Sequence, residues 1–138
     1  LIFIPLLGLF FIKVPSVPID RAAGRKSLKT LIAAANKVKA IGDSILSFPQ
    51  GTRVAPGASA SSHPYHSGTY AIYHATGLPV VPIALNSGIC WPRSSFMKKP
   101  GVIDVRLLEE IPPGLDRRSF MARLEHDIET ATAKLPSE

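Results

Sequence analysis

The sequence predicts an α/β fold in which helices flank a partly parallel β-sheet, and three features of the chain support this prediction. Residues 25–41 carry apolar side chains at helical spacing, and short apolar runs of strand length precede and follow them, at residues 16–20 and 44–48. A strand, a helix and a strand in this order form a unit with two parallel strands. A further run, residues 79–85, has the continuous apolar character of a fully buried strand.

The bulk composition indicates a single folded domain over residues 1–138. The chain has 138 residues, of which 46% are hydrophobic and 19% are charged. This is enough for one core but not for two, and it argues against disorder. Because the chain begins at Leu1 inside an apolar run, we expect it to be the C-terminal portion of an N-terminally truncated domain.

Residues 1–12 are almost wholly apolar and are followed by Lys13. A helix that crosses a bilayer needs roughly 20 such residues, so this stretch cannot span a membrane by itself. Pro5 and Gly8 also argue against a long helix. Three interpretations stay open: the tail of a truncated span, an interfacial segment, or a buried core element. We favour a segment that touches a membrane or lies next to one, and we expect residues 1–13 to be a membrane-proximal segment.

Residues 25–41 form the clearest predicted helix, which Gly42 can end. The apolar face of this helix consists of Leu28, Leu31, Ile32, Ala35 and Val38. The next run, residues 44–48, is predicted as a buried strand. Pro49 ends this strand, because proline cannot donate a hydrogen bond to a sheet ladder.

The second half of the chain is predicted to contain two more helices and two more strands. Residues 67–76 are predicted as a helix that ends at Gly77. Residues 79–85 follow as a strand, in which Pro82 requires an edge position or a bulge. Residues 86–101 are expected to be irregular.

The last strand is predicted from alternating polarity along the chain, and the last helix is predicted from a residue that can cap it. Residues 102–108 alternate in polarity, which predicts a strand near the margin of the sheet. Asp116 can cap a final helix. The apolar face of that helix consists of Phe120, Leu124, Ile128, Ala131 and Leu135.

The charge balance restricts the class of partner. The formal net charge is +6, which favours nucleic acid, anionic lipid or phosphorylated substrates. The chain has no zinc-ligand spacing, no aromatic nucleic-acid motif and no Lys/Arg block, so we expect no nucleic-acid partner. The apolar N-terminal segment favours membrane lipid. Cys90 is the only cysteine, which excludes an internal disulfide and is compatible with a reducing compartment.

The common nucleophile and metal motifs are absent from the sequence. It has no G-x-S-x-G elbow, no P-loop and no G-x-G-x-x-G. Cys90 could act as a nucleophile with a histidine, but a lone cysteine more often packs as a small core residue. His63 and His66 lack a cysteine or acidic partner at ligand spacing, so we expect two loop histidines and no metal site.

The segment that follows the predicted strand 44–48 has the residue types of an anion site. Gly51 allows a close backbone approach to a ligand or a positive φ angle. Thr52 offers a hydroxyl, and Arg53 offers a rigid fork of donors suited to phosphate. The alternative is an ordinary strand exit with a solvated arginine.

A second arginine strengthens the anion-site interpretation. Arg21 follows one predicted parallel strand and Arg53 follows the other. The C-terminal ends of parallel strands meet at one rim of an open sheet, where ligands bind. Two guanidinium groups there would suit a phosphate monoester. The alternative for Arg21 is an ion pair with a nearby carboxylate such as Asp20.

Three blocks of the sequence resemble signature blocks of the glycerolipid acyltransferase family. These blocks are Val17-Pro18-Ile19-Asp20-Arg21, Phe48-Pro49-Gln50-Gly51-Thr52-Arg53 and Val80-Val81-Pro82-Ile83-Ala84-Leu85. Their order and spacing fit across nearly the whole chain, and the second block is the most specific. The chain is most similar to the bacterial lysophosphatidate acyltransferases of this family.

The resemblance implies transfer of a fatty acyl group from acyl-CoA or acyl-carrier protein to the free hydroxyl of 1-acyl-sn-glycerol-3-phosphate. The product would be phosphatidate, formed at the cytoplasmic face of the inner membrane without any cofactor besides the acyl donor. The residues implied to bind the substrate phosphate are Arg21, Gln50, Gly51, Thr52 and Arg53. Pro49 and Pro82 are implied to shape the pocket.

The chain departs from the family pattern in three places. The H-x-x-x-x-D block, whose His is the family's general base, is absent, and we expect it upstream of Leu1. Gln50 stands where the family usually has glutamate, so any role that needs a carboxylate is lost. His66, which follows Tyr65, stands where the family often has lysine, so a fixed positive charge becomes conditional.

Two alternatives to lysophosphatidate acyl transfer stay open. The acceptor could be another lysophospholipid, a glycerol phosphate or an acylated amine, because pocket shape sets this choice. The chain could also be a non-catalytic module that binds anionic lipid.

Overall fold

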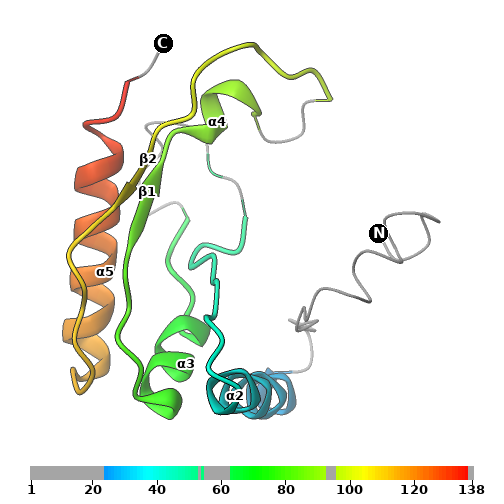
Figure 1. The fold of residues 1–138 in the computed structure, drawn as a ribbon, viewed down its shortest axis with the longest axis vertical. Helices are drawn as coiled ribbons and strands as arrows, with labels where there is room; N and C mark the ends of the chain where they lie inside the picture. The colour runs from blue at the N-terminus through cyan, green and yellow to red at the C-terminus, as the bar shows by residue number, and fades with distance from the viewer. Residues whose placement is uncertain (1–23, 53, 55–62, 93–95, 137–138) are drawn as a thin grey trace.

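The computed structural model describes residues 24–52, 54, 63–92 and 96–136. The helices and strands in these ranges are α2 (Gly24–Ala40), α3 (Gly68–Thr76), β1 (Ile83–Leu85), α4 (Ser87–Cys90), β2 (Val105–Leu107) and α5 (Arg117–Thr132). Helix α5 lies along the two strands, with α2 and α3 toward one end of them and α4 toward the other (Figure 1). Helices combined with a small sheet agree with the predicted α/β class.

The two strands of the described sheet are antiparallel. The register of β1 and β2 pairs Ile83 with Leu107, Ala84 with Arg106 and Leu85 with Val105. An isolated bridge between Val80 and Ile111 continues this pairing. Between the bridge and β1, the carbonyl of Pro82 accepts a hydrogen bond of 3.0 Å from the N–H of Leu108. Regular pairing thus starts after Pro82, as expected for a residue that has no N–H to donate.

The prediction of a strand over residues 44–48 is wrong. This segment has no regular secondary structure, and the side chains of Leu46 and Phe48 are 73% and 70% exposed. A strand requires partners for its backbone groups, and no described strand pairs with this segment. The parallel pairing of the predicted sheet is therefore not seen in the described ranges. Residues 16–20, the other strand of the predicted unit, lie outside them.

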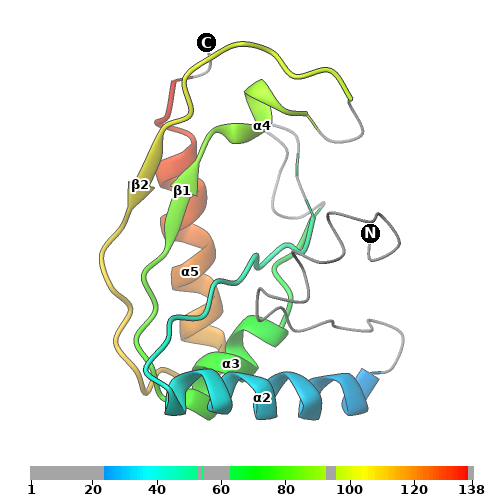
Figure 2. The ribbon, with the colours of Figure 1, turned by 45° about the vertical axis from the view of Figure 1, so that its right-hand side comes forward.

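Segment 41–52 follows α2 and has the same general direction as β1 (Figure 2). It runs from the end of α2 toward the same end of the molecule as β1 (Figure 2). The segment and the strand therefore share a direction, although no ladder of hydrogen bonds joins them.

The three predicted helices are present, with N-termini shifted by one residue at most. Helix α5 ends at Thr132, so Leu135, which was predicted to lie on its apolar face, follows the helix. Gly77 ends α3 in the left-handed conformation (φ 60°), and its N–H donates to the carbonyl of Tyr73. Asp116 caps α5, because its side chain accepts hydrogen bonds from the N–H groups of Arg118 and Ser119. The Ser119 hydroxyl and these backbone bonds lower the pKa of Asp116. Helix α4 was not predicted; its four residues are too few to give a helical periodicity.

The core lies between α3, α5 and the strand-bridge region. It consists of Tyr65, Tyr73, Ile111, Phe120 and Leu124. The rings of Tyr73 and Phe120 are stacked, with centroids 4.1 Å apart. The Tyr73 hydroxyl donates to the carbonyl of Pro112 over 2.7 Å and accepts from the N–H of Leu115 over 2.8 Å. A core residue of α3 thus fixes the turn that leads into α5.

Helix α2 packs against helix α3. Leu31 and Ala35 are buried, and a Cβ built on Gly68 would lie 3.6 Å from a methyl carbon of Leu31. The Lys39 ammonium also donates to the carbonyl of Thr76 at the end of α3. The helix face predicted from sequence is only partly covered within the described residues, since Leu28 is exposed.

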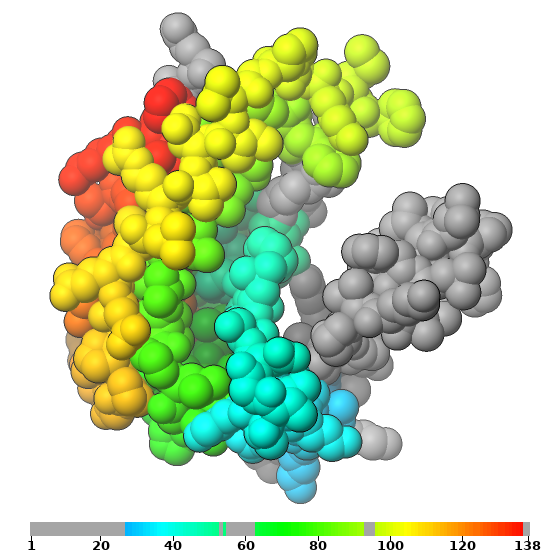
Figure 3. All heavy atoms as spheres, in the orientation of Figure 1, coloured from blue at the N-terminus to red at the C-terminus, as the bar shows by residue number. Residues whose placement is uncertain are grey.

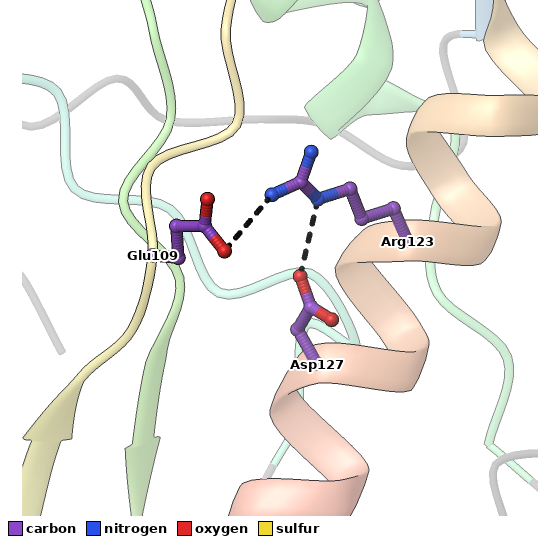
Figure 4. Close-up of polar contacts among 3 residues, drawn as sticks. All are labelled: Glu109, Arg123 and Asp127. Carbon is purple, nitrogen blue, oxygen red and sulfur yellow. Dashed lines mark hydrogen bonds and ion pairs between the residues drawn. The ribbon is translucent and has the colours of Figure 1, made fainter.

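Arg123 of α5 interacts with two carboxylates (Figure 4). Its Nη2 atom lies 3.7 Å from Oε2 of Glu109, and its Nε atom lies 3.4 Å from Oδ2 of Asp127. The side chain of Glu109 is exposed. Exposed pairs of this kind contribute about 0–1 kcal/mol to stability.

Candidate functional site

The centre of the candidate site, residues 48–52, forms a tight turn. The N–H of Gly51 donates to the carbonyl of Phe48 over 2.9 Å. Pro49 occupies the second position of this turn, which its ring favours by fixing φ. Gly51 has a φ angle of 62°, which a residue with a Cβ adopts only with strain. Of the two roles that the sequence allows for Gly51, the positive φ angle is the one that the structure shows.

The turn is held by residues 63–66, which lie just before α3. The N–H of His66 donates to the carbonyl of Pro49 over 2.8 Å. The side-chain amide Nε2 of Gln50 points to the carbonyl of His63 at 3.4 Å. A glutamate at this position would have no N–H to donate, so the amide has a contact that the usual family residue could not make.

Tyr65 anchors residues 63–66 to helix α5. Its ring is part of the buried core, and its hydroxyl donates to Oε1 of Glu129 over 2.8 Å, across 64 positions of the chain. Burial, and then the bond to Glu129, raise the pKa of the Tyr65 hydroxyl above its usual value. A series of contacts thus connects the 48–52 turn through residues 63–66 to α5.

Sequence reasoning missed the pair Tyr65 and Glu129. Tyr65 was noted only as the aromatic residue before His66. Glu129 lies on a helix whose apolar face was predicted, and nothing in the local pattern indicates a partner so distant in sequence. His66 itself is exposed.

The other predicted site residues are placed as follows. Thr52 is half-buried next to the turn. Pro82 is buried and takes part in strand pairing through its carbonyl. Arg21 and Arg53 lie outside the described residues, so the convergence of their guanidinium groups stays a prediction.

The described residues offer no alternative site of the kinds considered from sequence. Among them, no group of three or more His, Cys, Asp or Glu side chains could hold a metal ion. Cys90 is half-buried, and its sulfur would lie 2.8 Å from a Cβ built on Gly101. This close approach is typical of a packing role. No helix in the described ranges is long and apolar enough to cross a membrane.

The chain is similar to known acyltransferases. A family model described as Acyltransferase matches residues 1–86, which include the 48–52 turn and residues 63–66. The 1-acyl-sn-glycerol-3-phosphate acyltransferase of Pseudomonas aeruginosa is 33% identical over 105 residues, covering 76% of this chain and 40% of that protein. No solved structure matches the chain with significance.

Two plant proteins with the same name also match most of this chain but less than half of their own length. The protein from Limnanthes alba is 26% identical over 131 residues, which are 92% of this chain and 46% of the relative. The protein from Cocos nucifera is 28% identical over 112 residues, which are 80% of this chain and 35% of the relative. The chain therefore spans less than half the length of these curated relatives.

The family match covers more than half of the 138 residues, and it confirms the resemblance read from the three sequence blocks. The chain belongs to the acyltransferase family.

Proposed function

We propose that the protein containing this chain transfers a fatty acyl group to the free hydroxyl of 1-acyl-sn-glycerol-3-phosphate, giving phosphatidate. The family match and the common name of the relatives support this proposal. The acyl donor is a thioester, either acyl-CoA or acyl-carrier protein. The observation that carries the proposal is the 48–52 turn, which lies within the matched range and has Gly51 in the left-handed conformation.

In this proposal, residues of this chain bind the acceptor phosphate. The guanidinium groups of Arg21 and Arg53 make charge-assisted hydrogen bonds to the phosphate oxygens. The Thr52 hydroxyl adds a donor, and Gly51 allows the backbone to approach the substrate closely because it lacks a side chain. Holding the glycerol phosphate in this way aligns the acceptor hydroxyl with the thioester carbonyl, which can supply much of the rate.

The chemical step is an attack of the acceptor hydroxyl on the thioester carbonyl, with release of the donor thiol. A base must take the hydroxyl proton during this attack. No residue of this chain is assigned to that role, because the H-x-x-x-x-D pattern does not occur in it.

In this proposal, the side chain of Gln50 helps to hold the 48–52 turn in place. Its amide contacts the carbonyl of His63, and the Pro49 carbonyl accepts from His66. These two contacts keep the turn closed before substrate binds. A pre-formed turn lowers the ordering cost that binding would otherwise incur.

The lipid substrates place the reaction at a membrane surface, and we propose the cytoplasmic face of the inner membrane. Both the acceptor and the product carry an acyl chain that favours the bilayer, whereas the acyl thioester is delivered from the aqueous phase.

The proposal is tested by measuring acyl transfer with the protein expressed from its complete gene. Oleoyl-CoA and oleoyl-acyl-carrier protein serve as donors, and lysophosphatidate, lysophosphatidylcholine and glycerol 3-phosphate serve as acceptors. We expect phosphatidate from lysophosphatidate and at least tenfold lower kcat/KM for lysophosphatidylcholine, whose phosphate is a diester and carries less charge than the monoester of lysophosphatidate. Preference for another acceptor, or transfer to none of them, would contradict the proposal.

A further inference from the structure

The loop after α4 carries an unusual combination of exposed apolar and basic side chains. We define the loop patch as Trp91, Phe96, Met97, Lys98 and Lys99. The side chains of Phe96, Met97 and Trp91 are 98%, 75% and 46% exposed. Exposed clusters of large apolar residues are uncommon on soluble surfaces and often mark contact sites.

A backbone hydrogen bond holds the two ends of this loop together. The N–H of Lys99 donates to the carbonyl of Cys90 over 2.8 Å. The N–H of Trp91 donates to the carbonyl of Ser87 over 2.9 Å and so ends α4 where the loop begins. The loop is thereby closed at its base, directly beyond β1 and α4. Its described residues lie at the end of the molecule opposite α2, where the space-filling view shows them projecting (Figure 3).

The side chains of the patch lie close to one another. The Lys98 ammonium lies 4.4 Å from the centroid of the Trp91 ring, in a cation–π contact. Trp91, Phe96, Met97 and Lys98 together line an open hollow of about 410 Å³. Val102 and Ile103, which follow the base of the loop in sequence, are also exposed.

The patch is positively charged and lacks acidic neighbours in sequence. No Asp or Glu occurs from Ser87 to Ile103. Within the described ranges, the ion pairs formed are those of Arg123, so no carboxylate neutralises Lys98 or Lys99 there. The chain as a whole also carries a net charge of +6.

This chemistry fits an anionic lipid surface. Tryptophan is enriched at the level of lipid headgroups, and exposed apolar side chains next to it can enter the acyl boundary. Lysines beside them are attracted to anionic headgroups. We propose that the loop patch docks on the surface of an anionic bilayer.

A symmetric contact between two copies of the chain fits the patch less well. In such a contact the same surface meets itself. Lys98 and Lys99 of one copy would then approach those of the other, without a carboxylate in the patch to pair with them. The lipid proposal does not rest on the proposed acyl transfer, and its test involves no catalysis.

The first experiment uses the fluorescence of Trp91, the only tryptophan of the chain. The 138-residue protein is mixed with vesicles of phosphatidylcholine alone or with 30 mol% phosphatidylglycerol, and with matched vesicles whose acyl chains carry bromine. We expect a blue shift of the emission and quenching by the brominated lipids, both only with the anionic vesicles.

The second experiment measures co-flotation of variants with the anionic vesicles. Lys98→Gln combined with Lys99→Gln should weaken partitioning roughly thirty-fold. The control, Lys29→Gln combined with Lys37→Gln, removes the same charge from exposed positions of α2 and should weaken partitioning much less. A Phe96→Ser and Met97→Ser variant should also lose binding by about tenfold or more, whereas Ile41→Ser with Leu46→Ser, which are exposed at 71% and 73%, should not.

Specific results would overturn the proposal. One is flotation without any change or quenching of Trp91 emission, which would assign the lipid contact to another segment such as residues 1–12. Another is the absence of binding to anionic vesicles. A third is an emission shift that depends on protein concentration without lipid and accompanies a dimer in sedimentation, which would assign the patch to self-association.

Discussion

The backbone N–H of His66 donates to the carbonyl oxygen of Pro49 over 2.8 Å, and this bond joins the 48–52 turn to the residues that lead into α3. The residue next to it, Tyr65, is anchored in the core and bonded to Glu129 of α5. The candidate phosphate turn, in which Phe48 is exposed, is therefore connected to the most buried part of the described structure. We expect substitutions in the turn or along this connection to change the stability of the folded chain.

Gly51→Ala should destabilise the turn, because the residue has a φ angle of 62°. An alanine in the left-handed region costs roughly 1–2 kcal/mol, which should appear in the free energy of unfolding measured in urea. Gly68→Ala is the matched control. Its Cβ would make an ordinary contact of 3.6 Å with Leu31, so this variant should be at least as stable as the wild type. Equal stability of the Gly51→Ala variant and the wild type would show that the turn is not formed as described.

Gln50→Glu should weaken the closed turn, because a carboxylate cannot donate to the carbonyl of His63 as the amide does. We expect a loss of about 1 kcal/mol in the free energy of unfolding at pH 7. Gln50→Ala, measured beside it, removes the hydrogen bond without adding a charge and should cost less than the glutamate. If the glutamate variant is as stable as the wild type, the amide contact does not hold the turn. If it also transfers acyl groups at the wild-type rate, Gln50 only shapes the pocket.

Tyr65 makes stability depend on pH in the alkaline range. Burial and Glu129 raise its pKa in the folded state above the ordinary 10.0, so above pH 10 the unfolded chain loses this proton while the folded chain keeps it. The contribution is fully present below pH 10 and is lost as pH rises. Relative to Tyr65→Phe, the wild type should lose about 1.4 kcal/mol of unfolding free energy per pH unit above 10.

The measurement is urea unfolding between pH 9 and pH 11.5 for the wild type, Tyr65→Phe and the control Tyr70→Phe. The control should retain the wild-type slope, since Tyr65 is unchanged in it. Parallel curves for the wild type and Tyr65→Phe would mean that the Tyr65 hydroxyl is not held in the core by Glu129.

The parts of the fold that could be predicted from sequence depend on local chemistry. Helix α2 was found because its apolar side chains recur at helical spacing. The ends of α3 and α5 were found because Gly77 and Asp116 have conformational and hydrogen-bonding properties that act within one turn. The positive φ angle of Gly51 was one of the two roles that the absence of a side chain allowed.

The parts that could not be predicted depend on distant partners. Residues 44–48 have the composition of a buried strand, but burial requires neighbours that composition does not specify, and Phe48 is exposed. The bond between Tyr65 and Glu129 spans 64 positions, so neither residue indicates the other. Helix α4 is a single turn and gives no periodicity.

The central claim, that this chain binds the phosphate of lysophosphatidate, is tested most directly at Arg53. We predict that Arg53→Ala, in the protein expressed from its complete gene, lowers kcat/KM for lysophosphatidate about ten- to a hundredfold. The reason is the loss of a charge-assisted contact worth roughly 1.5–3 kcal/mol. The matched control is Arg118→Ala, which removes an exposed arginine of α5 and should leave kcat/KM unchanged. An unchanged kcat/KM in the Arg53→Ala variant would contradict the assignment of this segment to the substrate phosphate.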